Sequence, residues 1–184
     1  SILVAYTLMQ VHMQQGNADK ALALCNEAIE THHNAAAYLL RADAYLRLNQ
    51  SDKALVDLGQ AMALEPQNPN VWEARAGVHQ IAGRLPEAIS DIRRALALAP
   101  EQSRIQRLAV RLFLASGSDS LAREAEDLLK NAIADPKKRD PEMTLLMARF
   151  RMSQRTRTGP AVAEARSLLR QLTEEYPRNV EAWV

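Results

Sequence analysis

Apolar residues recur three and four positions apart along nearly the whole chain, which is the spacing of one buried face of an α-helix. Gly and Pro residues stand between the amphipathic segments and mark their ends. The pattern predicts ten helices, with an eleventh beginning near Val180. By residue number the ten span about 2–15, 18–31, 35–48, 51–64, 69–82, 85–98, 102–115, 119–134, 141–153 and 160–175.

The predicted helices form pairs that repeat along the chain. A proline closes four of the pairs, at Pro66, Pro100, Pro136 and Pro177, with spacings of 34, 36 and 41 residues. One alanine recurs in the middle of each unit, at Ala21, Ala54, Ala88, Ala125 and Ala165, with spacings of 33, 34, 37 and 40. A small residue at such a site lets two helices approach to about 8–10 Å. We therefore expect an array of helix pairs.

The two middle units carry the most complete motif. Residues 38–66 read Tyr-x-x-Arg-Ala-x-x-Tyr, then Ala-x-x-x-Leu-x-x-Ala, then Pro. Residues 72–100 read Trp-x-x-Arg-Ala-x-x-His, then Gly, Ala-x-x-x-Ile-x-x-Ala and Pro. This motif resembles the tetratricopeptide repeat family, and the resemblance covers nearly the whole chain. It implies an all-α fold, a right-handed superhelical solenoid of antiparallel helix pairs with about five repeats and the start of a sixth.

The repeat divides the chain into units 2–34, 35–68, 69–101, 102–140 and 141–179, and residues 180–184 start a further helix. We expect a single solenoid domain. Because no Met stands at position 1, we also expect a fragment of a longer protein. The fourth unit is longer by about three residues and the fifth by about six. We expect these extra residues in the loops around 117–120 and 154–159.

Composition and motifs exclude several classes of function. The chain has 23 basic and 22 acidic residues, a formal charge of +1, which is too balanced for a protein that coats nucleic acid or an anionic membrane. One cysteine excludes an intramolecular disulfide. No apolar run is long enough to span a bilayer and no signal peptide is visible, so the compartment stays undetermined. Without a phosphate loop, nucleophile motif or metal-ligand spacing, we expect no enzymatic activity, cofactor or metal.

Two first-helix arginines, Arg41 and Arg75, stand where the family usually has leucine, and an aspartate follows each by 16 residues. The other three units have apolar residues at both positions, namely Leu8/Leu24, Leu108/Leu128 and Met147/Leu168. Because an unpaired charge in a packed seam is costly, the pattern predicts Arg41–Asp57 and Arg75–Asp91 ion pairs. Binding of a ligand by the two arginines is the alternative.

Three further residues invite a chemical role and are interpreted as packing residues. His12 and His79 occupy the repeat position of Tyr45, and Cys25 occupies that of Leu58. A buried cysteine without an activating neighbour behaves as a small hydrophobe.

In the family the first helices line a concave groove, so the resemblance implies a set of partner-binding positions. These are Tyr6, Gln10, Met13, Leu39, Asp43, Leu46, Glu73, Gln80, Gln106, Val110, Phe113, Leu145, Arg149 and Met152. The positions that would form a chaperone-type carboxylate clamp lack the cationic set, with Tyr6, Gln10, Leu40, Asn70 and Ala74 in one window. We therefore expect a non-enzymatic scaffold that binds a peptide or helix with apolar anchors.

Two other functions stay open. An arginine cluster at 149–157, preceded by Lys137-Lys138-Arg139, could bind phosphate or nucleic acid, although the sparse aromatic residues disfavour this. Self-association through exposed end helices is the second alternative.

Overall fold

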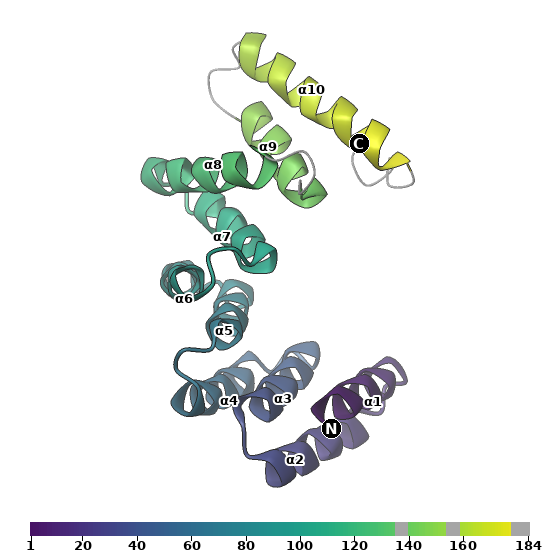
Figure 1. Ribbon diagram of the computed structural model, residues 1–184. Helices are drawn as coiled ribbons and strands as arrows, with labels where there is room; N and C mark the ends of the chain where they lie inside the picture. The colour runs from purple at the N-terminus through teal and green to yellow at the C-terminus, as the bar shows by residue number, and fades with distance from the viewer. Residues whose placement is uncertain (135–139, 154–158, 178–184) are drawn as a thin grey trace. The chain divides into compact units, whose positions relative to one another are not determined.

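The computed structural model describes residues 1–134, 140–153 and 159–177, and the elements in these ranges are ten α-helices (Figure 1). Each helix end lies within one residue of its predicted position, which confirms the all-α prediction. The eleventh helix, predicted near Val180, falls outside the described residues. The helices are α1 (Ile2–Gln14), α2 (Ala18–His32), α3 (Ala35–Arg47), α4 (Ser51–Leu64), α5 (Pro69–Ile81), α6 (Leu85–Leu98), α7 (Ser103–Ala115), α8 (Asp119–Ala134), α9 (Pro141–Ser153) and α10 (Gly159–Glu175).

A short turn with one left-handed residue separates the two helices of each of the first four pairs. The left-handed residues are Gly16, Asn49, Gly83 and Gly117, with φ angles of 75°, 58°, 72° and 69°. In the first three turns the next residue's N–H bonds at 2.8 Å to the carbonyl five residues back, as in Arg84 N to His79 O. This pattern satisfies the last carbonyls of the first helix and reverses the chain.

A glycine in a turn and a glycine inside a helix should respond in opposite ways to replacement by alanine. Gly83→Ala should lower the free energy of unfolding by about 1 kcal/mol, because a Cβ disfavours its φ of 72°. Gly77→Ala should raise it by about 0.5–1 kcal/mol, because Gly77 lies inside α5 and, apart from its chain neighbours and the nearby backbone of α5, no atom lies within 4 Å of the place that the added methyl group would take. Urea denaturation of both variants measures the pair, and effects of the same sign would contradict this account.

The structure forms two compact bodies, residues 1–108 and 109–184, and the boundary falls within α7. In the first body, α2 and α4 each pack small residues against the first helix that follows. One core cluster joins α1 and α2 to α3 and consists of Met9, Ala21, Cys25, Ala28, Ala37, Leu40 and Ala44. A second joins α3 and α4 to α5 and consists of Ala35, Ala42, Ala54, Leu58, Ala61, Val71 and Val78.

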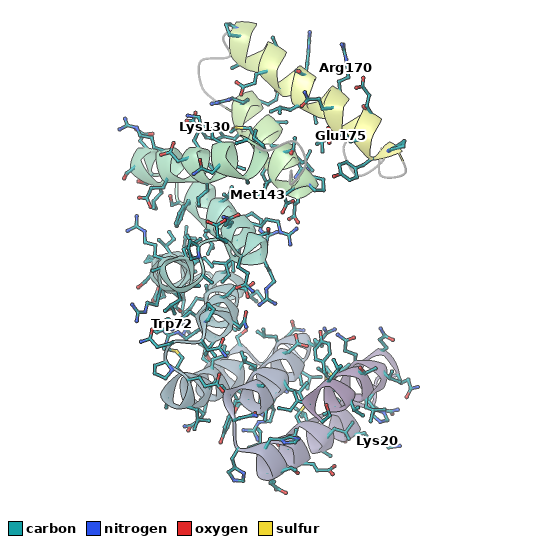
Figure 2. The ribbon with its side chains drawn as sticks, in the orientation of Figure 1. Lys20, Trp72, Lys130, Met143, Arg170 and Glu175 are labelled. Atoms are coloured by element: carbon teal, nitrogen blue, oxygen red, sulfur yellow. The ribbon has the colours of Figure 1, made fainter. Side chains whose placement is uncertain are left out.

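In the second body, α9 packs against both α8 and α10. Its core includes Leu129 of α8, Met143 of α9 (labelled in Figure 2) and Leu172 of α10, all fully buried. None of the described helices is both long and apolar enough to cross a membrane.

The extra residues of the fourth unit lie in a helix, so the prediction that they lengthen the loop is wrong. The turn at 116–118 has the same length as the turns at 48–50 and 82–84, whereas α8 has 16 residues and α6 has 14. The longer α8 begins with Asp119, whose negative charge suits a helix N-terminus. In the fifth unit α10 likewise has 17 residues, and positions 154–158 of the expected loop lie outside the described residues.

Both predicted arginine–aspartate pairs are present and bidentate. The Arg41 guanidinium donates to the two carboxylate oxygens of Asp57 at 2.8 and 2.7 Å, and Arg75 donates to Asp91 at 2.8 and 2.6 Å. The aspartate side chains are 2% and 5% exposed, and the arginine side chains 24% and 27%. The bonds to Asp57 raise the pKa of the Arg41 guanidinium. Arg41 Nη1 also donates to Asn26 of the preceding unit at 2.8 Å.

Candidate functional site

An apolar pocket of about 380 Å³ opens between α1 and α3, on the face formed by first helices. Its lining comprises Ile2, Leu3, Tyr6, Ala36, Leu39, Leu40 and Asp43. Five of these seven residues are aliphatic, and the polar groups are the Tyr6 hydroxyl and the Asp43 carboxylate. Such a cavity suits an apolar side chain with one hydrogen-bond donor beside it.

The repeat places these residues together. Leu3 and Tyr6 lie on α1 at the same repeat positions as Ala36 and Leu39 on α3, 33 residues later. Residues three apart on a helix share a face, and α1 contacts α3, so the two faces form a common wall. Leu3 and Tyr6 are 73% and 39% exposed, which leaves their side chains accessible to a partner.

An ion pair borders the pocket. Asp43 Oδ2 accepts a hydrogen bond from Arg47 Nε at 3.0 Å, one helical turn further along α3. This contact raises the pKa of the Arg47 guanidinium, with a smaller contribution from Tyr6. Both charged side chains remain accessible, at 36% and 42% exposure, so a bound peptide can compete for either.

The structure brings three of the fourteen predicted lining residues into this pocket, namely Tyr6, Leu39 and Asp43. Seven others are half-buried or exposed outside the pocket lining: Gln10, Met13, Leu46, Gln80, Gln106, Arg149 and Met152. The last two lie in the second body.

Four predicted lining residues are buried: Glu73, Val110, Phe113 and Leu145, at 9%, 0%, 2% and 8% exposure. The Glu73 carboxylate pairs with the Arg104 guanidinium, which explains how an acidic residue is accommodated there. Because buried side chains do not present a surface to a partner, we leave these four out of the candidate site.

Sequence reasoning missed Ile2, Leu3, Ala36 and Leu40 in the pocket lining. A signal for two of them was present, because Leu3 and Ala36 precede Tyr6 and Leu39 by one helical turn on the same face. The first residues of an end helix are easily overlooked, since the motif begins further along the chain.

Arg151 of the predicted arginine cluster is held in ion pairs, and much of the rest of the basic stretch lies outside the described residues. Arg151 lies 3.0 Å from Glu126 and 2.9 Å from Glu164, and its side chain is 13% exposed. Glu126 also pairs with Lys130 at 2.9 Å. Arg149 is exposed, whereas positions 137–139 and 154–158 of the basic stretch lie outside the described residues.

The cysteine is buried and one histidine lies beside an ion pair. Burial raises the pKa of the Cys25 thiol to about 11, so a negligible fraction is thiolate at neutral pH. His79 Nε2 lies 3.6 Å from Asp91 Oδ2, beside the Arg75 pair. Within the described ranges, no three His, Cys, Asp or Glu residues gather closely enough to hold a metal ion.

Comparison with known proteins gives consistent matches. A sequence model of the tetratricopeptide repeat matches residues 6–71 and 73–138. Human tetratricopeptide repeat protein 13 is 32% identical over 77 residues, which is 42% of this chain and 9% of that protein. The chain therefore spans less than a tenth of this curated relative.

Two solved structures show the same fold. A thermophilic tetratricopeptide repeat protein of Thermus thermophilus has a TM-score of 0.69 and 19% identity, covering 98% of this chain and 94% of its own. The first tetratricopeptide repeat domain of Spaghetti (RPAP3), bound to the HSP90 peptide SRMEEVD, has a TM-score of 0.54 and 24% identity. That match covers 64% of this chain and 94% of the RPAP3 domain.

Proposed function

The chain belongs to the tetratricopeptide repeat family, whose members typically mediate protein–protein interaction, and we propose that it is a non-enzymatic scaffold that binds a peptide or helix. The observation that carries this proposal is the apolar pocket between α1 and α3. It is large enough for one large apolar side chain, with an exposed wall at Tyr6 and a half-buried one at Leu39. The partner inserts one apolar side chain into the pocket, and the rest of its bound segment lies along the first helices.

Asp43 sets the polar preference of the site. Its carboxylate is the acidic group in the pocket lining, and it accepts a hydrogen bond from Arg47. A backbone N–H or a basic side chain beside the anchor can compete with Arg47 for this carboxylate. The RPAP3 domain is bound to the HSP90 peptide SRMEEVD, which has three acidic residues, but here the matching clamp positions include Tyr6, Gln10 and Leu40. We therefore propose a partner other than an acidic C-terminal tail.

A selection experiment tests the groove without knowledge of the natural partner. Peptides that bind the chain are first selected from a displayed random library. The affinity of each selected peptide for the chain is then measured by fluorescence anisotropy. Leu39→Glu should weaken selected peptides at least about 10-fold, because it places a charge in the apolar pocket. Val56→Glu is the matched control, since Val56 is 65% exposed on α4 and outside the pocket. Unchanged affinity with Leu39→Glu, or preferential selection of acidic C-terminal tails, would contradict the proposal.

We also propose that the five units form one array. The support is the constant turn, in which a left-handed residue recurs in four units that span both bodies. Small-angle X-ray scattering should therefore give a single rigid particle at all temperatures below unfolding. A scattering profile that requires two independently moving bodies would contradict this.

A further inference from the structure

A second groove, of about 650 Å³, lies along α6 beside Trp72 of α5, which is labelled in Figure 2. We call it the α6 groove, and it shares no lining residue with the pocket between α1 and α3. Its lining comprises Trp72, Pro86, Ile89, Ser90, Arg93, Arg94 and Ala97. The groove thus combines an aromatic ring, apolar side chains and two arginines, and it contains no acidic residue.

The Trp72 ring is fixed and has two cations against it. The indole Nε1 donates a hydrogen bond to Pro66 O at 2.9 Å. The guanidinium carbons of Arg75 and Arg94 lie 5.0 and 5.9 Å from the centre of the ring. A cation over an aromatic face is attracted by the electrons of the ring. The ring therefore holds the Arg94 guanidinium in place near the C-terminal end of α6.

Arg94 is the cation of this cluster that is not in an ion pair. Arg75 is bound to its aspartate, and Arg93 has a partner of its own. Arg94 is exposed and forms no ion pair within the described residues. Apart from the indole ring, it contacts Gln67, with Nη2 3.4 Å from Oε1, which is long for a hydrogen bond. Its charge is therefore available to an anion from outside the chain.

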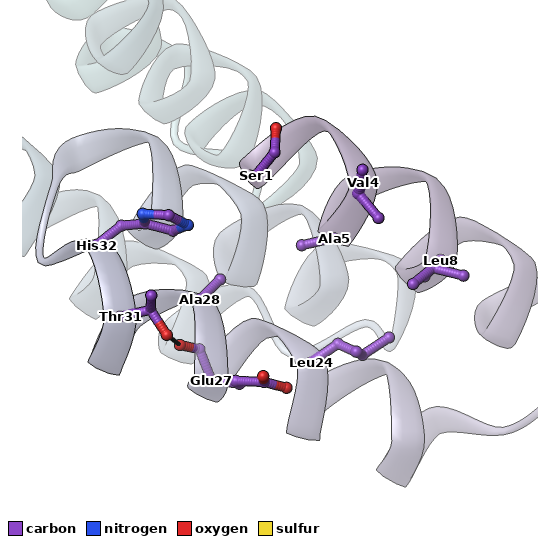
Figure 3. A pocket seen from close by; sticks show the side chains of 9 residues that line it. All are labelled: Ser1, Val4, Ala5, Leu8, Leu24, Glu27, Ala28, Thr31 and His32. Carbon is purple, nitrogen blue, oxygen red and sulfur yellow. Dashed lines mark hydrogen bonds between the residues drawn. The ribbon is translucent and has the colours of Figure 1, made fainter.

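The combination of tryptophan and arginine occurs in the third unit alone among the five. The position of Arg94, six residues after the recurring alanine, holds Glu27, Gln60, Arg94, Asn131 and Gln171 in the five units. The position of Trp72 holds Ala5, Tyr38, Trp72, Ile105 and Thr144. In the first unit, Ala5 and Glu27 both line a pocket between α1 and α2 (Figure 3). Packing of the repeat therefore requires neither the indole nor the guanidinium.

We propose that the α6 groove is a second partner-binding site, which takes an internal Asp or Glu of a protein partner at Arg94 and an apolar side chain of the same segment at Pro86 and Ile89. One cation that is not in an ion pair balances a singly charged carboxylate, whereas a phosphate carries nearly two charges. Glu87, in the first turn of α6, disfavours the opposite placement of the acid.

The length of the groove sets the spacing in the partner. Pro86 and Arg94 are eight residues apart on α6, which is about 12 Å along the helix axis. An extended peptide covers that distance in three or four residues, at about 3.3 Å per residue. The bound segment therefore carries its acidic residue three or four positions from its apolar residue.

A subtractive selection tests this site with peptides. A displayed library of random peptides, fused at both ends so that no free C-terminal carboxylate is present, is selected against the full chain. An excess of soluble Arg94→Gln chain is added as a competitor, and it removes peptides that bind independently of Arg94. The retained peptides should carry Asp or Glu three or four positions from an apolar residue.

Variants of the chain then locate the bound peptide. Arg94→Gln should weaken amidated, fluorescein-labelled copies of the retained peptides at least about 10-fold in fluorescence anisotropy, because it removes the cation. The variant should keep its helical circular dichroism, since the second unit has Gln60 at this position. Arg84→Gln is the matched control, because Arg84 is 46% exposed and lies outside the groove lining. Leu39→Glu should also leave the affinity unchanged, which separates this site from the pocket between α1 and α3.

Four outcomes overturn the inference. The selection enriches no peptide above the starting library, or the retained peptides lack an acidic residue. Replacing the acid of a retained peptide with glutamine weakens binding equally in the parent and Arg94→Gln chains, which would show that the acid lies elsewhere. Phosphoserine in place of the acid tightens binding at least about 10-fold, which would assign the groove to a phosphorylated partner.

Discussion

Replacing Arg41 with leucine should lower the free energy of unfolding by about 3 kcal/mol at neutral pH, because it strands a buried carboxylate. Asp57 is 2% exposed and accepts two hydrogen bonds from Arg41, at 2.8 and 2.7 Å. Leucine leaves that charge without a cation in a seam that water barely reaches. The expected loss lies at the low end of the range of about 3–5 kcal/mol for removing one partner of a buried ion pair, because the Arg41 side chain is 24% exposed.

Removing the aspartate as well should restore most of the lost stability. The first unit shows that the seam tolerates this, because Leu8 and Leu24 hold the two positions there. In a double-mutant cycle by urea denaturation, Arg41→Leu and Asp57→Leu should therefore show a coupling energy of about 2 kcal/mol. A coupling energy below about 0.5 kcal/mol would contradict the buried-pair account.

An exposed pair of the same chemistry provides the matched comparison. Arg47 and Asp43 lie four residues apart on α3, with exposures of 42% and 36%. Arg47→Ala should change the free energy of unfolding by at most about 0.5 kcal/mol, because water solvates the remaining carboxylate. Comparing the losses of unfolding free energy in the Arg41 and Arg47 variants shows how much of the effect comes from burial of the ion pair and how much from the ion pair itself.

Sequence alone was sufficient for the helix ends and the ion pairs, because each rests on a short-range or repeated signal. Helix ends follow from apolar spacing and from residues such as Gly83, whose left-handed φ stops the helix. The pairing of Arg41 with Asp57 followed from comparing the five units, in which both positions are charged or both are apolar. Internal repeats thus constrain which side chains meet, even across two helices.

Burial of the first-helix face could not be predicted in the same way, because it depends on neighbouring elements. Glu73 occupies a groove position by spacing, yet it pairs with Arg104, which belongs to a later helix. Likewise, the extra residues of the fourth unit suit either a loop or a longer helix, and Asp119 at the start of α8 favours the helix. Local propensity and tertiary contacts decide such cases together.

Replacing Arg75 with leucine should lower the free energy of unfolding as the same change at Arg41 does, and a second change at His79 should deepen the loss. At about pH 7.5 the loss should again be about 3 kcal/mol, because Asp91 is 5% exposed and loses bonds of 2.8 and 2.6 Å. His79 Nε2, however, lies 3.6 Å from Asp91 Oδ2. Once Arg75 is absent, the His79 ring nitrogen still lies beside the stranded carboxylate.

A double variant measures what the histidine contributes. Adding His79→Tyr to Arg75→Leu should lower the free energy of unfolding by about 1 kcal/mol more than His79→Tyr does in the parent chain, because it removes the ring nitrogen 3.6 Å from Asp91 Oδ2. The second unit has Tyr45 at the position of His79, so Arg41→Leu has no such neighbour. Equal effects of His79→Tyr in the two backgrounds, measured by urea denaturation, would show that the histidine does not reach the stranded aspartate.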